Sequence, residues 1–148
     1  MLIIPLFLSS LSISAQNNSD YDQAIAEIKS QFGTVPIMFE VFPKHALSGA
    51  WESFKALHGP ENKIPGKYRE LIQLSVASQI PCNYCIYFHK ALAMANGASV
   101  EEVQEAIAFG ANTRHWSMVL QGTQMDFKDF KKEFDGMLEY MQKHAEDQ

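Results

Sequence analysis

The chain has 148 residues, of which 47% are hydrophobic and 20% are charged. This composition excludes a disordered or low-complexity protein, because such chains lack the apolar surface that offsets conformational entropy. Twelve Lys and Arg against seventeen Asp and Glu give a net charge of -5, the wrong sign for neutralising phosphates, so we expect no nucleic-acid partner. Two cysteines are too few for a disulfide scaffold.

The N-terminal segment Met1–Ala15 has the pattern of a secretory signal peptide. It contains no charged side chain, carries an apolar run over Leu2–Leu8 and ends in small residues, although the usual Lys or Arg near the start is missing. Cleavage after Ala15 predicts one helical domain over residues 16–148, in a periplasmic or secreted protein. The alternative is a cytoplasmic protein in which this segment is a buried helix or precedes the true start. Beyond this leader no apolar run approaches the roughly 20 residues that span a bilayer, so we expect no membrane span.

The first part of the chain predicts two helices with a short apolar piece between them. Apolar side chains recur at helical spacing after Asp20, and Gly33 suits the left-handed conformation that ends such a helix. Pro36 and Pro43 then bracket an apolar piece. A second stripe ends at Gly59, and its members are Leu47, Trp51, Phe54 and Leu57.

A third helix is expected to open at Pro65 or Gly66. It must stop at Ile80, because the residue before Pro81 disfavours the helical region of backbone space. Helical spacing predicts an inward face made of Tyr68, Leu71, Ile72, Leu74, Ser75 and Ser78.

The rest of the chain also predicts helices. One starts near Pro81 and ends at Gly97, and the next opens at Ser99, whose partner Glu102 completes a capping box, and ends at Gly110. Two further helical stripes follow, Asn112–Leu120 and Phe127–Met141. No Asn-Gly or Asp-Gly pair separates β-branched runs, so no hairpin is predicted. The fold class is therefore all-α, a helical bundle with a Cys-X-X-Cys at a helix N-terminus.

Three side chains that can carry chemistry share one face of the helix expected after Pro81. Cys82, Cys85 and His89 stand at i, i+3 and i+7, which at 100° per residue fall within an arc of about 60°. The cysteines are expected in the first turn, where free backbone N–H groups and the helix dipole lower a thiol pKa from about 8.5. This placement favours a reactive thiolate.

Other uses of a Cys-X-X-Cys fit less well. A c-type haem site requires His directly after the second Cys, where Ile86 stands, and a thioredoxin-type site requires a preceding strand, which is not predicted. A structural zinc site needs four ligands; the two cysteines and His89 supply three, and Glu70 or another His could complete the set. A structural disulfide between residues three apart closes a short loop worth only about 2 kcal/mol.

The string Glu70, eleven residues, Cys82-Asn-Tyr-Cys85, three residues, His89 resembles the signature of the alkylhydroperoxidase AhpD-like branch of the carboxymuconolactone decarboxylase family. The resemblance covers roughly residues 36–122, and its other features are Leu71, Ser75, the run Ala91–Gly97 with the Ser99 capping box, and Thr113–Ser117. It implies an all-helical homo-oligomer, a trimer or hexamer, that needs no cofactor and no metal. It also implies that the two cysteines act as a thiol peroxidase pair.

The resemblance assigns roles to four residues. Cys85 matches the thiolate that attacks the peroxide, and Cys82 matches the resolving thiol. Glu70 and His89 match the relay that removes the proton from the attacking thiol. On spacing alone, Glu70 beside Arg69 would be interpreted as a solvated surface residue.

Tyr84 and His115 are further candidates for contact with the substrate. Tyr84 stands where better-known members carry a His between the cysteines, so one relay member is either absent or replaced by a phenol that can donate to a bound peroxide. His115, beside Trp116, is expected either to point toward the site or an interface or to be an ordinary packed or surface histidine.

The sequence thus predicts a thiol-dependent peroxidase or dithiol–disulfide oxidoreductase, with a hydroperoxide substrate and an external thiol or dithiol reductant. Two alternatives from other classes stay open. One is a lactone decarboxylase, the other named activity of the family, whose members generally lack the cysteine pair. The other is a non-enzymatic helical module whose thiols hold a metal ion.

Overall fold

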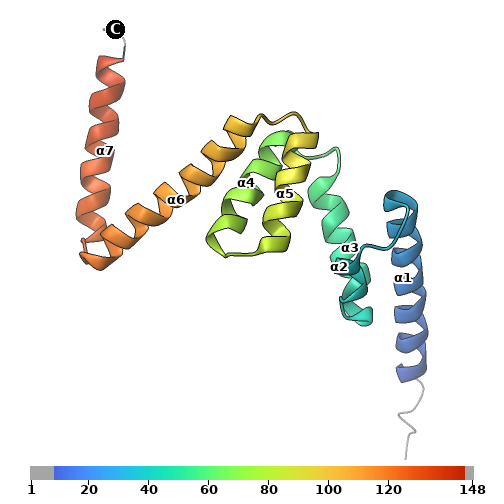
Figure 1. The fold of residues 1–148 in the computed structure, drawn as a ribbon. Coiled ribbons are helices and arrows are strands. Elements are labelled where there is room, and N and C mark those ends of the chain that lie inside the picture. The colour runs from blue at the N-terminus through green and yellow to red at the C-terminus, as the bar shows by residue number, and fades with distance from the viewer. Residues whose placement is uncertain (1–8, 146–148) are drawn as a thin grey trace, which may run out of the picture. The chain divides into compact units, whose positions relative to one another are not determined.

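The computed structural model describes residues 9–145, and within them it shows helices and no strand (Figure 1). The all-α prediction is confirmed. Of the expected leader Met1–Ala15, Met1–Leu8 lies outside the described residues and Ser9–Ala15 belong to the first helix. None of the helices in the described part is both long and apolar enough to cross a bilayer. The chain divides into two compact units, Met1–Lys63 and Ile64–Gln148.

The first unit holds helices α1 (Ser9–Phe32), α2 (Ile37–Glu40) and α3 (Lys44–His58). The first helix begins at Ser9, earlier than the apolar spacing after Asp20 predicts, and no Pro or Gly interrupts the chain between Ser9 and Phe32. Gly33 has a φ of +75°, as its predicted capping role requires. The core of this unit lies between α1 and α3 and is formed by Ala24, Ile28, Phe39, Leu47 and Trp51.

Aromatic rings fill the first unit. Trp51 is 1% exposed, stacks on Phe54 with ring centroids 5.5 Å apart, and meets Phe39 edge-on at 5.6 Å. Its indole Nε1 donates to the carboxylate of Glu27 at 2.8 Å, and Lys55 Nζ donates to the same carboxylate oxygen at 2.6 Å. Hydrogen bonds from Lys55, then from Gln23 and Trp51, lower the pKa of Glu27 from 4.5 to about 2.

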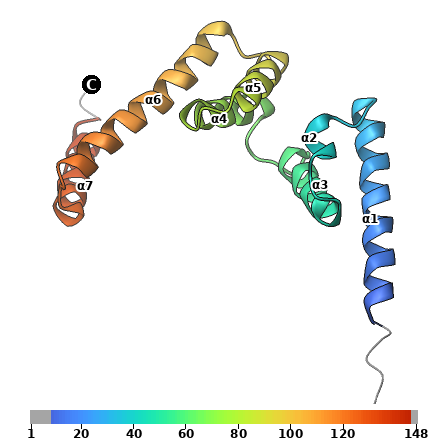
Figure 2. The same cartoon turned by 60° about the horizontal axis from the view of Figure 1, so that its bottom comes forward.

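The second unit holds α4 (Gly66–Gln79), α5 (Asn83–Ala95), α6 (Val100–Gly122) and α7 (Phe127–His144). Helix α4 packs against both α5 and α6, and two views show α4 and α5 side by side (Figures 1 and 2). The buried hydrophobic side chains here are small or aliphatic: Leu74, Ala77, Ala93, Ala98 and Val103. Helices lined by such residues can approach closely.

The inward face expected for α4 is only partly correct. Leu74 is fully buried, but Tyr68 and Ile72 are 51% and 52% exposed. The buried stripe instead passes through Glu70, Leu74 and Ala77. The prediction counted apolar residues alone and therefore placed the buried face of α4 on the side away from Glu70. The buried carboxylate of Glu70 explains the error.

The predicted helix end at Gly110 is also wrong, because α6 continues through it to Gly122. A Cβ placed on Gly110 would lie 2.4 Å from Ser75 Oγ and 3.1 Å from the Ser75 carbonyl oxygen of α4. The glycine therefore allows α4 and α6 to come into close contact and does not end the helix. The capping box at the start of α6 is confirmed: the amide of Glu102 donates to Ser99 Oγ at 3.1 Å, and the Glu102 carboxylate accepts the Ser99 amide at 2.8 Å.

Helix α7 begins at an N-cap, Asp126, whose carboxylate accepts the amides of Lys128 and Asp129. In the described part of the chain, none of its residues is buried. An apolar stripe of α7 is exposed and consists of Phe127, Phe130, Phe134, Met137, Leu138 and Met141.

Candidate functional site

The turn between α4 and α5 places the two cysteines differently from the sequence prediction. Cys82 lies before α5 as its N-cap, with an extended backbone, and only Cys85 lies in the first turn. Cys82 Sγ accepts the amide of Cys85 at 3.3 Å. A sulfur thus takes the position that Ser, Thr, Asp or Asn usually fills at a helix start. The prediction of a cysteine pair at a helix N-terminus is confirmed.

Cys82 and Cys85 form a disulfide, with their Cα atoms 5.3 Å apart. Both residues are half-buried, so the disulfide lies near the surface. Among the described residues, no group of three or more His, Cys, Asp or Glu side chains is arranged to hold a metal ion. The chemistry that this arrangement directly offers is interconversion between a dithiol and a disulfide.

Glu70 and His89 come together across the α4–α5 interface. Glu70 is 2% exposed, and its Oε2 lies 2.8 Å from Nδ1 of His89. An ionised carboxylate can only accept hydrogen bonds, so beside it Nδ1 carries the proton and Nε2 is the ring nitrogen left to accept another. The expectation of a solvated Glu70, which spacing alone favours, is wrong.

His89 follows Cys85 by four residues on α5, and residues so spaced are neighbours on a helix surface. The ring of Phe88 packs edge-on against the imidazole, with centroids 5.2 Å apart. The side chain of His89 is 16% exposed. A buried carboxylate, an oriented imidazole and a sulfur pair therefore follow one another from α4 to the start of α5.

Arg69 is a residue of this site that the sequence analysis did not single out. Its Nε lies 3.7 Å from Oε1 of Glu70, and this Nε is buried without a hydrogen-bond acceptor. The sequence offered one signal, a cation directly before the matched Glu70. Spacing alone could not show that the Arg69 side chain lies beside a buried carboxylate of Glu70.

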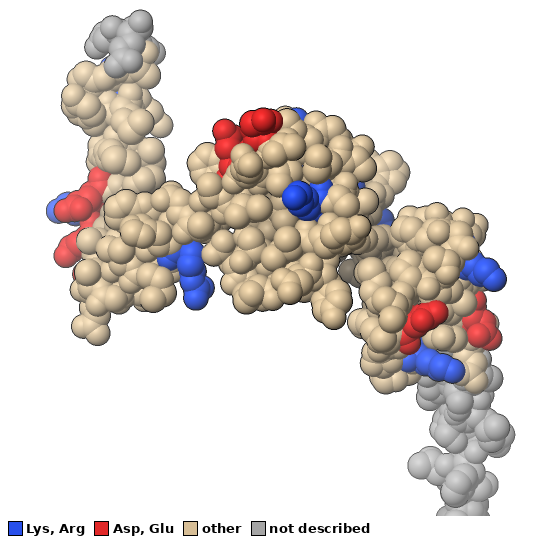
Figure 3. Space-filling view, viewed as in Figure 1, with Lys and Arg blue, Asp and Glu red and all other residues tan. Residues whose placement is uncertain are grey.

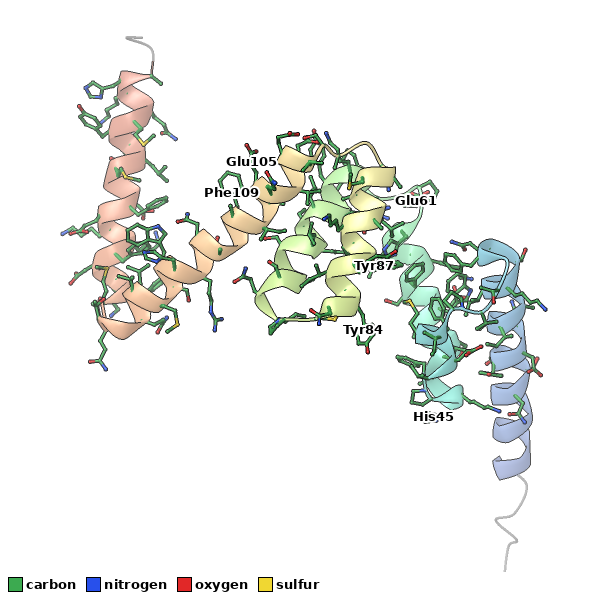
Figure 4. All side chains as sticks on the ribbon, in the orientation of Figure 1. His45, Glu61, Tyr84, Tyr87, Glu105 and Phe109 are labelled. Carbon is green, nitrogen blue, oxygen red and sulfur yellow. A yellow bond between two sulfur atoms is a disulfide. The ribbon has the colours of Figure 1, made fainter. Side chains whose placement is uncertain are left out.

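Tyr84 and His115, the other predicted residues, are both exposed. Tyr84 is 89% exposed on the first turn of α5, between the two cysteines in sequence (Figure 4). His115 lies in the second half of α6, where its ring packs edge-on against Trp116 at 5.4 Å. In this single chain the side chain of His115 is exposed.

The stretch of chain that contains the cysteines is uncharged and partly apolar. No Asp, Glu, Lys, Arg or His occurs from Leu71 to Phe88. Within this stretch Ile80 is 62% exposed and Tyr87 is 79% exposed. In the space-filling view most of the surface over α4 and α5 belongs to uncharged residues (Figure 3).

Comparisons with known proteins agree with this architecture. The model of the carboxymuconolactone decarboxylase family matches residues 46–124, more than half of the chain. The fold is similar to the crystal structure of the alkylhydroperoxidase AhpD core from Rhodospirillum rubrum, with a TM-score of 0.63 and 22% identity over 85% of this chain and 93% of that chain. At this identity the likeness shows an AhpD-like fold. A search of curated proteins finds no match.

Proposed function

The chain belongs to the carboxymuconolactone decarboxylase family, and on this premise we propose that it is a thiol-dependent peroxidase or dithiol–disulfide oxidoreductase. One observation carries the proposal. A cysteine pair able to form a disulfide lies one helical turn before His89, whose Nδ1 is held by the buried carboxylate of Glu70. This arrangement supplies both a redox pair and a base.

The oxidative half of the reaction starts from the reduced pair. Nε2 of His89 takes the proton of Cys85, and the thiolate attacks one oxygen of a hydroperoxide. An S–O bond forms and the O–O bond breaks, which leaves a sulfenic acid and an alcohol once the leaving oxygen has regained a proton. Cys82 then attacks the oxidised sulfur, the S–S bond forms, and water leaves.

The reductive half requires an external thiol or dithiol. Its thiolate attacks the Cys82–Cys85 disulfide, and a second thiol completes the exchange, so two electrons enter for each peroxide reduced. The exposed Ile80, Tyr84 and Tyr87 support the approach of an apolar hydroperoxide or reductant. These steps use only side chains of the protein and its two reactants.

The thiol pair favours this chemistry over lactone decarboxylation, which the family also includes. In that alternative the two sulfurs would have no part in turnover. A lactone derived from a ring-opened aromatic metabolite tests this alternative. Its consumption at a rate that blocking both cysteines leaves unchanged would favour the decarboxylase.

Peroxide consumption in the presence of dithiothreitol tests the proposal. We expect Cys85→Ser to abolish the dithiol-dependent rate, and Cys82→Ser to allow about one fast peroxide reduction per chain before the rate falls, because no second sulfur is placed to resolve the sulfenic acid. Lys90→Gln, an exposed neighbour of His89, is the matched control and is expected to keep the wild-type rate. Equal rates in all four proteins would contradict the proposal.

We further propose that the protein is a homo-oligomer and that it is exported. Exposed apolar residues on α6 and α7, including Trp116 and Phe134, support association with other chains. The charge-free segment Met1–Ala15 supports export. Light scattering of the purified protein, and the mass of the mature N-terminus after expression with the leader, test the two points separately.

A further inference from the structure

Arg69 lies at the one place in the site where a buried charge needs a partner. We propose that Arg69 is a positioning residue: its guanidinium supplies the fixed positive charge beside the buried carboxylate of Glu70, and it acts on Cys85 through Glu70 and His89. This inference rests on the proposed function only in taking Cys85 as the reactive thiol.

The burial of Glu70 creates the need for a counter-charge. At 2% exposure the carboxylate is removed from water, and a buried charge is costly unless it is paired. His89 donates a hydrogen bond to Oε2, but an imidazole that serves as a base must be neutral for part of the cycle. A permanent cation must therefore come from another side chain.

Among the described residues, the basic side chain that lies within 4.0 Å of the Glu70 carboxylate is that of Arg69. Helix α5 brings His89 to this carboxylate and otherwise carries the exposed Lys90. In the described part of the chain, the ion pair between α6 and α4 joins Glu102 to Lys67 at 2.7 Å. Because Lys67 is already matched, Arg69 alone is placed to offset the charge of Glu70.

The contact is one of charge and not of hydrogen bonding. The distance of 3.7 Å from Arg69 Nε to Glu70 Oε1 is too long for a hydrogen bond, and the buried Nε–H has no other acceptor. A buried donor without an acceptor has a cost that a purely structural arginine would avoid. A guanidinium stays protonated at any working pH, so its effect on Glu70 does not vary while His89 gains and loses a proton.

Loss of this cation changes which imidazole nitrogen carries the proton. In a variant without this cation, the arrangement expected at the buried site is a carboxylic acid whose O–H keeps its proton and donates a hydrogen bond to Nδ1 of His89. The ring proton then resides on Nε2, which becomes a donor and can no longer accept the proton of Cys85. The variant is therefore expected to resemble one that lacks the Glu70 charge.

A double-mutant cycle tests this inference on the reduced full-length protein, with the rate of Cys85 alkylation by iodoacetamide followed against pH by mass spectrometry. Arg69→Gln and Glu70→Gln are each expected to slow alkylation at pH 7 about 5-fold to 10-fold and to move its midpoint upward by about one pH unit. The double variant is expected to show no further loss, because both changes remove the same interaction. Arg69→Lys is expected to restore most of the rate.

Lys67→Gln is the matched control, since it removes a cation of the same helix that is paired with Glu102, and its alkylation profile is expected to equal that of wild type. Thermal unfolding by circular dichroism checks that each variant is folded, and Arg69→Met replaces Arg69→Gln if the latter is not. The ¹⁵N shift of His89 Nε2 gives a second measurement, expected to change from an unprotonated to a protonated nitrogen in Arg69→Gln. An unchanged profile in Arg69→Gln, or losses that add in the double variant, overturns the inference.

The alkylation experiment uses no peroxide, so its outcome is separate from that of the peroxidase assay. A positive cycle with no peroxide turnover would retain the role of Arg69 and remove the proposed activity. Peroxide turnover together with an unchanged alkylation profile in Arg69→Gln would retain the proposed activity and remove the role of Arg69.

Discussion

The two units of this chain bring helices together in different ways. In the first, rings of Phe39, Trp51 and Phe54 fill the space beside α1 and α3. In the second, α4, α5 and α6 meet through Ala, Val and Leu side chains and at Gly110. The difference teaches where a site can form. Among residues 9–145, it is the close helices of the second unit that bring a buried carboxylate within 2.8 Å of an imidazole on another helix.

The carboxylates of the two units show the same contrast. Glu27 keeps 35% of its side chain exposed and takes three donors, whereas Glu70 is 2% exposed and has one hydrogen bond and one distant cation. The first arrangement joins two helices, and the second keeps a functional group out of water. Substitutions in each unit can test whether the two units differ in this way.

The largest expected effect is in the aromatic core. Trp51→Ala should lower the free energy of unfolding by about 3–5 kcal/mol, because a ring that is 1% exposed leaves a large cavity. Urea unfolding followed by circular dichroism measures the loss. In buffer without urea, the alkylation rate of Cys85 should stay at the wild-type value; a parallel fall in that rate would show that the site depends on the first unit.

The close approach in the second unit gives the next largest effect. Gly110→Ala should destabilise the protein by about 1–3 kcal/mol, because its Cβ would meet Ser75 within 2.4 Å. Gly136→Ala in α7 is the matched control: nothing lies within 4 Å of its Cβ, so the gain in helix propensity, up to about 1 kcal/mol, should dominate. The same sign for both variants in urea unfolding would contradict the close contact.

Helix caps should give smaller effects that depend on packing. Ser99→Ala removes the capping box of α6, which packs on α4, and should cost about 1 kcal/mol of unfolding free energy. Asp126→Ala removes the cap of α7, a helix with no buried residue in the described part, and should lower helix content with little change in the main unfolding transition. Equal shifts of that transition would show that α7 is packed in solution.

The smallest expected effect is the response of the first unit to acid. The pKa of Glu27 is lowered in the folded protein from 4.5 to about 2. Its stabilising contribution is therefore complete above pH 4.5 and is lost as the pH falls through about 2. Between these values the melting temperature of Glu27→Gln should fall less steeply than that of wild type; identical slopes would exclude this carboxylate as the source.

Local chemistry allowed several features to be predicted from the sequence. Pro81 marks the end of α4, Gly33 ends α1 with a positive φ, and Ser99 with Glu102 opens α6, because each of these depends on residues close together in the chain. The order of Glu70, Cys82, Cys85 and His89 likewise indicated the family. The family model matched it over residues 46–124.

The errors arose where a second helix decides the outcome. A glycine that ends a helix and one that admits a neighbouring helix look alike in sequence, and only the position of Ser75 distinguishes them at Gly110. Which face of α4 is buried depends on the carboxylate of Glu70, whose partner His89 lies on α5. Apolar periodicity could not locate this face. Arg69 was missed for the same reason.

The position of Cys82 at the start of α5 links electron transfer to backbone order. The atom that accepts the Cys85 amide is itself one of the two that gain electrons when the disulfide is reduced. Reduction breaks the S–S bond that fixes Cys82 Sγ beside this amide, so the first turn of α5 should fray more in the dithiol form. The rate of deuterium uptake at the Cys85 amide would then report whether the cysteine pair is oxidised or reduced.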